Sequence, residues 1–219
     1  YFLHLVHPEI YMYVTAGTRL WNAAILAIDY FNKKYGDEIK QNPSSAKSSL
    51  LELGCGLGVP GMIAHIIGVS RVVLTDQDSI LDQIRTNIAS NFTSEEGSVI
   101  EGMTLNWSRQ DIVELLENCD LSSTGFDFVL NCDCVYEPLY GKDSRVMLVE
   151  VIKYLLTVNP KCIVISSVER RKGDGVDTFL DDMKQMEIEH GVADDFIVEL
   201  ISRDEDFNIE IYETRRRRQ

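Results

Sequence analysis

The chain has 219 residues, of which 45% are hydrophobic and 26% are charged, and its formal net charge is −14. This length and composition predict one compact α/β domain with an ample core. The acidic balance argues against nucleic acid as a partner, because affinity for phosphates needs a surplus of Lys and Arg, and it favours a protein with a basic surface. With no apolar run as long as a membrane span and no signal-peptide pattern, we expect a cytoplasmic protein without membrane contact, with the nucleus as the alternative.

The cysteines and histidines show no metal-binding pattern. Cys132 and Cys134 are too close in sequence for a zinc knuckle, and the four histidines do not cluster. We therefore expect reduced thiols and no metal. We also expect a monomeric protein. The run 215–218, four consecutive arginines, is interpreted as a solvated tail, with an arm that contacts RNA as the alternative.

The first predicted element is a helix over residues 21–35, which has apolar residues at helical spacing and ends at Gly36. Residues 39–48 are polar and predict a surface loop. We expect residues 1–48 to form an N-terminal segment and helix that cap a ligand site, and residues 49–219 to form the core of the same compact domain.

A glycine turn follows the next predicted strand, residues 50–53. Gly54, Gly56 and Gly58 form a G-x-G-x-G pattern directly before a helical stretch. Glycine suits such a turn because it adopts positive φ and lets a ligand approach the backbone, and the helix N-terminus that follows is expected to offer free N–H groups. A second strand, residues 71–75, ends in Asp76, at the distance that places a carboxylate over a ribose. A nucleoside-containing cofactor is therefore predicted.

The remaining elements alternate between helices and strands. We predict helices over 80–91, 110–118, 141–158 and 174–189, strands over 98–105, 126–132 and 161–168, and a closing antiparallel hairpin of strands over 196–201 and 207–212. This order predicts a doubly wound, mostly parallel, Rossmann-like sheet with an antiparallel edge. Ligands in such sheets bind at the carboxyl ends of the strands, so one crevice should collect the glycine turn, Asp76, Asn106, Trp107 and residues 132–136.

The glycine pattern and its flanks distinguish between cofactors. A dinucleotide site prefers G-x-G-x-x-G, and Glu52 before the first glycine would repel a pyrophosphate. S-adenosylmethionine carries no phosphate and is cationic at sulfur, so an acidic crevice suits it. A P-loop is excluded because the chain has no G-K-[ST] sequence.

Four motifs give the chain a family resemblance. The segments 52–58 (ELGCGLG), 75–76 (TD), 105–107 (LNW) and 133–136 (DCVY) resemble the motifs of seven-β-strand methyltransferases, and more narrowly those of methyltransferase family 16, which contains protein-lysine methyltransferases acting on elongation factors and chaperones. The segment 17–24, around Trp21, is similar to that family's N-terminal tryptophan motif. Ser108 follows the L-x-W sequence where many relatives have Gly.

The resemblance implies S-adenosylmethionine as cofactor, S-adenosylhomocysteine as product, and the lysine side chain of a folded, basic protein as acceptor. It implies that Asp133 and Tyr136 are catalytic and line the channel for the amine. The cofactor-binding residues that it implies are Trp21, Glu52, Gly54, Cys55, Gly56, Gly58, Asp76, Gln77, Trp107 and Cys132. Within this set Asp76 would accept from the ribose hydroxyls, Trp107 would stack beside the adenine, and Trp21 would close over the methionine end.

Each residue also has a purely structural interpretation. Asp76 could be a turn carboxylate, Trp107 and Trp21 core aromatics, Asp133 a buried structural acid, and Tyr136 a packing residue. Residues 169–171 (ERR), after a buried strand, are interpreted as a solvated turn, with orientation of a peptide substrate as the alternative. For the chain as a whole, the alternatives are a methyltransferase of RNA or of a small molecule, and a non-catalytic cofactor-binding subunit.

Overall fold

The computed structural model describes residues 17, 19–41, 48–93, 99–184 and 196–217. Seven strands form one mixed sheet in the order β3-β2-β1-β4-β5-β7-β6, mostly parallel with an antiparallel pair at the C-terminal end. The predicted fold class is therefore confirmed. The chain divides into two compact units, one made of residues 1–106 and 130–132 and the other of residues 107–129 and 133–219. The predicted boundary at residue 48 stays a prediction.

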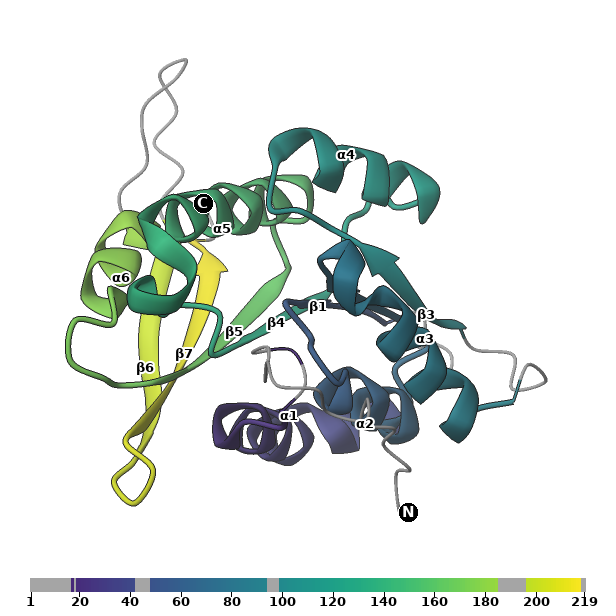
Figure 1. The fold of residues 1–219 in the computed structure, drawn as a ribbon. Coiled ribbons are helices and arrows are strands. Elements are labelled where there is room, and N and C mark those ends of the chain that lie inside the picture. The colour runs from purple at the N-terminus through teal and green to yellow at the C-terminus, as the bar shows by residue number, and fades with distance from the viewer. Residues whose placement is uncertain (1–16, 18, 42–47, 94–98, 185–195, 218–219) are drawn as a thin grey trace. The chain divides into compact units, whose positions relative to one another are not determined.

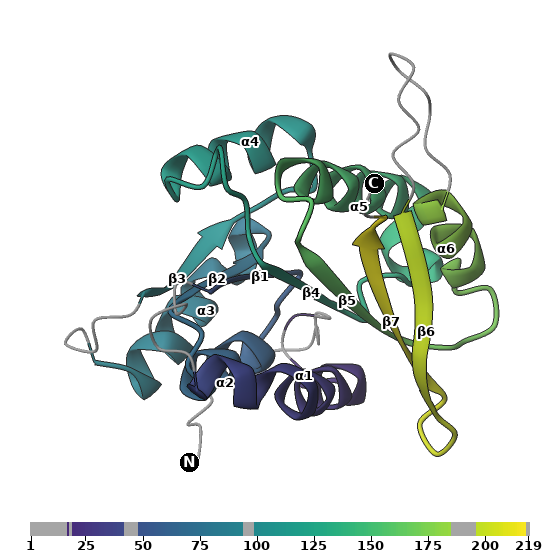
Figure 2. The same cartoon turned by 180° about the vertical axis from the view of Figure 1, so that it is seen from behind.

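The first unit alternates helices and strands. Its elements are α1 (Asn22–Gln41), β1 (Ser49–Leu53), α2 (Val59–Ile67), β2 (Arg71–Asp76), α3 (Asp78–Asn91) and β3 (Val99–Thr104). β1 and β3 both pair in parallel with β2, so Leu50 lies beside Val72 and Val72 beside Ile100. All five residues of β1 are buried, as expected for a parallel strand covered on both faces. In Figures 1 and 2, α1 lies alongside α2.

Helix α1 is longer than predicted. The expectation that it ends at Gly36 was wrong, because the helix continues to Gln41. Gly36 is buried, and a Cβ built on it would lie 3.6 Å from Cγ2 of Ile67 in α2. A glycine inside a helix costs only about 1 kcal/mol relative to alanine, so packing against α2 can outweigh its tendency to end the helix.

The second unit carries most of the C-terminal half of the chain and the first two residues of β4. Its elements are α4 (Arg109–Asn118), β4 (Phe128–Cys132), α5 (Glu137–Val158), β5 (Ile163–Glu169), α6 (Val176–Lys184), β6 (Phe196–Asp204) and β7 (Ile209–Arg216); the last three residues of β4 belong to the first unit. β6 and β7 form the predicted antiparallel hairpin. β7 also pairs antiparallel with β5, so the last strand lies between β5 and β6 (Figure 1). Chain order alone does not predict this insertion.

Helix α5 begins earlier than predicted and contains a break. Its first turn starts at Glu137, and Gly141, the predicted start, has φ 81 and ψ 167 inside the element. Arg145 holds the short first turn, because its Nε donates to Oε1 of Glu137 at 2.8 Å and its Nη1 pairs with Asp182 of α6. The turn directly after Tyr136 is therefore held by an ion pair that spans the break, from Glu137 to Arg145.

The helices and the cysteines give two further findings. None of the helices in the described residues is both long and apolar enough to cross a lipid bilayer. All five cysteines are free thiols in the structure, and four of them are buried. Cytoplasmic localisation stays a prediction.

Candidate functional site

The glycine turn joins β1 to α2 through backbone that only glycine adopts readily. Gly54, Gly56 and Gly58 have φ values of 59, 53 and 73, all in the left-handed region. The turn is tied to the neighbouring strand, because the N–H of Cys55 donates to the carbonyl of Thr75 at 2.9 Å, and the Cys55 carbonyl accepts from Gly58 at 2.8 Å. The predicted reason for these glycines, positive φ, is confirmed.

The segment before Trp21 lies against this turn. A Cβ built on Gly56 would be 3.1 Å from the carbonyl oxygen of Gly17, and Nε2 of Gln83 donates to the same oxygen at 3.3 Å. Trp21 itself is half-buried directly before α1, with the guanidinium of Arg19 4.9 Å from its ring centroid. The structure thus brings the predicted N-terminal motif to the glycine turn, while the contact of Trp21 with a cofactor stays a prediction.

Asp76 ends β2 with its carboxylate on the glycine turn. Oδ2 accepts from the N–H of Gly56 at 2.8 Å, and Oδ1 accepts from the N–H of Gln77 at 2.8 Å. Burial raises the pKa of Asp76, and the hydrogen bonds from Gly56 and Gln77 oppose that rise only in part. A carboxylate offers about four acceptor positions, so two remain for the hydroxyls of a ribose. The Gln77 side chain is exposed, and its backbone is the part that serves Asp76.

Glu52 lies behind the turn and contradicts one expectation. It is 1% exposed, and its Oε2 accepts from the N–H of Gly61 in the first turn of α2 at 2.8 Å. Met62 donates to the Gly58 carbonyl, and Pro60 has no N–H. The expectation that the start of α2 offers its N–H groups to a ligand was therefore wrong for these three positions, because Glu52, the helix itself and a proline account for them.

The charge of Glu52 also differs from the expectation that this residue repels a pyrophosphate. Burial raises its pKa to about 8, with the hydrogen bond from Gly61 opposing the rise and the nearby charge of Asp76 adding to it. At neutral pH the group is therefore largely protonated. Glu52 disfavours a phosphate at this helix because it occupies the Gly61 N–H. Charge repulsion contributes much less, because the carboxyl group is largely neutral.

Trp107 and Ser108 stand at the start of α4. Trp107 is half-buried, so it is not a fully enclosed core aromatic. Ser108, which follows the L-x-W sequence, is the N-cap of α4, and its hydroxyl accepts from the N–H of Asp111 at 3.0 Å. Cys132, the last residue of β4, is half-buried in the first unit.

Asp133 is the most constrained of the predicted catalytic residues. Its φ is 59, which is uncommon for a residue with a side chain, and it is only 6% exposed. Its N–H donates to the Ser167 carbonyl at 2.7 Å, and its Oδ1 accepts from the N–H of Glu169 at 3.1 Å. The end of β5 therefore holds both the backbone and the carboxylate of Asp133.

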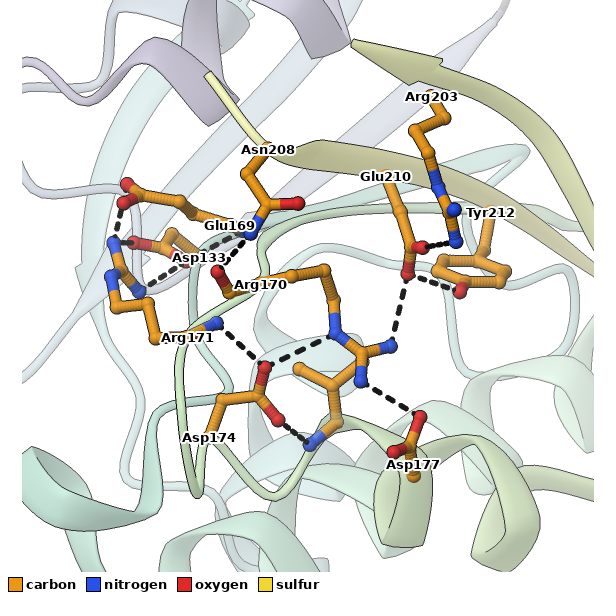
Figure 3. A network of polar contacts seen from close by, with 11 residues as sticks. Asp133, Glu169, Arg170, Arg171, Asp174, Asp177, Arg203, Asn208, Glu210 and Tyr212 are labelled. Carbon is orange, nitrogen blue, oxygen red and sulfur yellow. Dashed lines mark hydrogen bonds and ion pairs between the residues drawn. The ribbon is translucent and has the colours of Figure 1, made fainter. Parts of the chain in front are cut away.

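Arg171 completes this arrangement, and sequence reasoning gave it no role at Asp133. Its Nη2 lies 2.6 Å from Oδ2 of Asp133, its Nη1 lies 3.1 Å from Oδ1, and Nη2 also pairs with Glu169 at 2.6 Å (Figure 3). The same guanidinium carbon is 4.8 Å from the ring centroid of Tyr136, so Arg171 joins the two predicted catalytic residues. The signal that could have found it is the E-R-R sequence directly after a buried strand.

Arg170 belongs to a separate set of ion pairs. It donates to Asp174 at 3.1 Å, to Asp177 at 2.8 Å and to Glu210 of β7 at 3.0 Å, while Asn208 donates to its carbonyl (Figure 3). Burial raises the pKa of Glu210, but hydrogen bonds from Tyr212, Arg203 and Arg170 outweigh it, so the pKa is lowered. The interpretation of residues 169–171 as a solvated turn was therefore wrong, because both arginines are fixed by carboxylates.

The predicted site residues fall into two groups by unit. Gly54–Gly58, Asp76 and Cys132 belong to the first unit, and Trp107 and residues 133–136 belong to the second. The prediction that one crevice contains both groups of residues stays a prediction. Among the described residues, no three His, Cys, Asp or Glu side chains are gathered as a metal ion would need.

Comparison with known proteins places this geometry in a family. The sequence model of the lysine methyltransferase family matches residues 9–186. The chain belongs to this family. Members use S-adenosylmethionine as the methyl donor, as the resemblance in the motifs implied.

Three relatives illustrate the range of the family match. The chain is 38% identical over 130 residues to secreted RxLR effector protein 48 of Plasmopara viticola, and the match covers 56% of this chain and 64% of that protein. It is 28% identical over 202 residues to EEF1A lysine methyltransferase 3 of Mus musculus, covering 92% and 73%. It is 25% identical over 158 residues to calmodulin-lysine N-methyltransferase of Arabidopsis thaliana, covering 71% and 48%. The chain thus spans between about half and three quarters of the length of these relatives.

Solved structures support the fold. A TehB-like SAM-dependent methyltransferase from Corynebacterium glutamicum is similar with a TM-score of 0.54 and 14% identity, covering 90% of this chain and 98% of that one. A ribosomal protein L11 methylase from Lactobacillus delbrueckii subsp. bulgaricus gives a TM-score of 0.51 and 16% identity, covering 96% and 91%. At these identities the likeness shows the fold alone.

Proposed function

We propose that this chain transfers a methyl group from S-adenosylmethionine to the side-chain amine of a lysine on a folded, basic protein. The observation that carries the proposal is the carboxylate of Asp76, which lies on the N–H of Gly56 in the left-handed glycine turn. This is the arrangement that a β-turn-α-β unit needs to hold a ribose beside its backbone.

The residues of the glycine turn fit this cofactor. Asp76 keeps two acceptor positions for the ribose, and the close approach of Gly17 to Gly56 leaves no room for a side chain on the turn. A dinucleotide would need the first N–H groups of α2 for its pyrophosphate, and Glu52 already occupies that of Gly61. The structure therefore favours a nucleoside without phosphates.

When bound, S-adenosylmethionine supplies an electrophilic methyl group on a sulfonium. The protein has to hold a neutral amine in line with that group, because a protonated amine has no free electron pair. Asp133 is the proposed acceptor for an amine N–H, and Tyr136 is the proposed wall of the channel, with cation–π attraction to a methylated lysine. The rigid hold of β5 on Asp133 suits a positioning role.

The acceptor protein is proposed from charge and from relatives. The net charge of −14 favours a basic partner, and the relatives named above include methyltransferases of an elongation factor and of calmodulin. We place a translation elongation factor first and a chaperone or ATPase second. Association of an acidic enzyme with a basic partner should slow as ionic strength rises. We further propose a monomeric, cytoplasmic protein.

The test is incubation with isotopically labelled S-adenosylmethionine and a cell lysate, followed by mass spectrometry of the lysate proteins. The wild-type protein should add label to lysine. Asp133→Asn should bind the cofactor as the wild type does but should add little label, because it loses the charged acceptor while asparagine still tolerates the left-handed backbone.

Asp120→Asn is the matched control. Asp120 also has positive φ, at 55, but it is exposed after α4. This variant should retain full activity. Label on RNA, on a metabolite or on histidine would replace lysine as the acceptor, and absence of any label with intact cofactor binding would favour a non-catalytic subunit.

A further inference from the structure

The carboxylate of Asp133 is nearly saturated by the protein itself. Oδ1 accepts from the N–H of Glu169 and from Nη1 of Arg171, both at 3.1 Å, and Oδ2 accepts from Nη2 of Arg171 at 2.6 Å. Of the roughly four acceptor positions on a carboxylate, one therefore remains, on Oδ2. A substrate amine that uses Asp133 must donate there, directly beside the Arg171 guanidinium.

The position of Arg171 changes which form of the amine this site accepts. Asp133 and Glu169 carry two negative charges, Arg171 carries one positive charge in contact with both, and the neutral ring of Tyr136 lies beside it. The Arg171 side chain is 19% exposed and that of Asp133 6%, so solvent screens these charges only in part. A lysine ammonium would be attracted by the carboxylates and repelled by the guanidinium, whereas a neutral amine can still donate one N–H to Oδ2.

We propose that Arg171 is a positioning residue which, through Asp133, offsets the attraction of the carboxylates for an ammonium and so raises the neutral fraction of the target lysine amine. It fixes the Asp133 carboxylate by a two-pronged pairing, and its positive charge lowers the pKa of an ammonium at Oδ2. The proton leaves to water. The amine nitrogen then forms the bond to the methyl carbon, while the sulfur–carbon bond breaks and its electron pair returns to sulfur.

The neighbouring arginine provides the contrast that makes this testable. Arg170 carries the same charge in the same loop, but its side chain pairs with Asp174, Asp177 and Glu210, and none of these is a partner of Asp133 (Figure 3). Consecutive residues of one loop thus serve two separate sets of carboxylates. Removing either charge alters the loop, but only removal of the Arg171 charge should change the pKa of the substrate ammonium at Asp133.

The experiment measures the initial rate of lysine methylation from pH 7 to pH 10 for the wild type, Arg171→Gln, Arg171→Lys and Arg170→Gln. It rests on the proposed function and uses the protein fraction of a cell lysate as acceptor, with saturating labelled S-adenosylmethionine. Unfolding curves first establish that each variant is folded at the assay temperature. Ratios of variant to wild-type rates remove the titration of other groups that all four proteins share, such as Glu52.

Arg171→Gln should lose about tenfold in rate at pH 7, because loss of one adjacent charge raises the pKa of the bound ammonium by about one unit. The deficit should narrow as the pH approaches 10. Arg171→Lys should keep the wild-type pH profile at a lower maximal rate, because lysine retains the charge but not the planar fork. Arg170→Gln should leave the pH dependence of the methylation rate as in the wild type.

Three results overturn the inference. A deficit of Arg171→Gln that is the same at every pH, or one that Arg170→Gln reproduces, means that Arg171 only supports the loop, and the proposed function survives. A wild-type protein that labels no lysine at any pH overturns the proposed function and this inference with it.

Discussion

Oε2 of Glu52 accepts a hydrogen bond from the backbone N–H of Gly61 across the glycine turn, at 2.8 Å. The pair links the end of β1 to the first turn of α2, and both residues are buried. A carboxyl group in this place has no water to stabilise its charge, so burial raises its pKa to about 8. The glycine turn is thus supported from behind by a group that is largely neutral at physiological pH.

Glu52→Gln should abolish part of the pH dependence of stability. Between the unfolded pKa near 4.5 and the folded value of about 8, the folded protein holds a proton that the unfolded chain does not. The stability contributed by this group is therefore full below pH 4.5 and is lost as the pH rises to 8, by roughly 1.4 kcal/mol per pH unit. Glutamine cannot titrate, so denaturant unfolding at pH 5 and pH 8 should show a flatter dependence for the variant. The exposed Glu117→Gln should keep the wild-type slope, and an equal slope for Glu52→Gln would refute the assignment.

Asp76→Asn should weaken binding of S-adenosylmethionine. The variant keeps the shape of the side chain but loses the charge that accepts from Gly56 and Gln77 and, as proposed, from the ribose. A lost hydrogen bond to a charged acceptor costs roughly 1.5–3 kcal/mol, which is at least a tenfold rise in Kd. Calorimetry measures this directly. Asp78→Asn, two residues further on and exposed, is the control that should leave Kd unchanged.

Trp107→Ala should raise the Kd for the cofactor and leave the protein folded. Trp107 is half-buried beside the N-cap of α4, so its removal opens no enclosed cavity. If it stacks beside the adenine, its loss removes an aromatic contact worth about 1 kcal/mol or more. Cofactor titration and an unfolding curve separate the two effects. Loss of cooperative unfolding would assign Trp107 to the core instead.

Alanine at Gly36 and at Gly56 should have opposite effects on stability. Gly36 is helical, and its added Cβ meets mainly the flexible end of Asn32, so Gly36→Ala should stabilise by about 0.5–1 kcal/mol. Gly56 has φ 53, and its added Cβ would lie 3.1 Å from the backbone oxygen of Gly17, so Gly56→Ala should destabilise. Denaturant midpoints of the two variants against the wild type test the pair. A stabilising Gly56→Ala would show that the approach of Gly17 imposes no constraint.

Where local pattern sets the structure, the sequence was sufficient. The order of helices and strands and the hairpin of β6 with β7 follow from periodicity and turn residues, which act over a few positions. The errors lie where packing between elements overrides local preference. α1 continues through Gly36 because it packs on α2, and α5 gains a turn before Gly141 because Arg145 and Asp182 hold Glu137 in place.

The sequence by itself determined the fold class, the cofactor motif and the resemblance to the lysine methyltransferases, because glycine spacing and strand-end residues are written in consecutive positions. Only the tertiary structure decided what these residues touch. Asp133 and Arg171 are 38 positions apart in sequence, and they meet because the Asp133 N–H pairs with the Ser167 carbonyl near the end of β5. Gly17 and Gly56 are also far apart in sequence, and they approach each other only in the folded structure. Ion pairs and close backbone approaches depend on which strand ends the sheet brings together, and no local pattern contains that information.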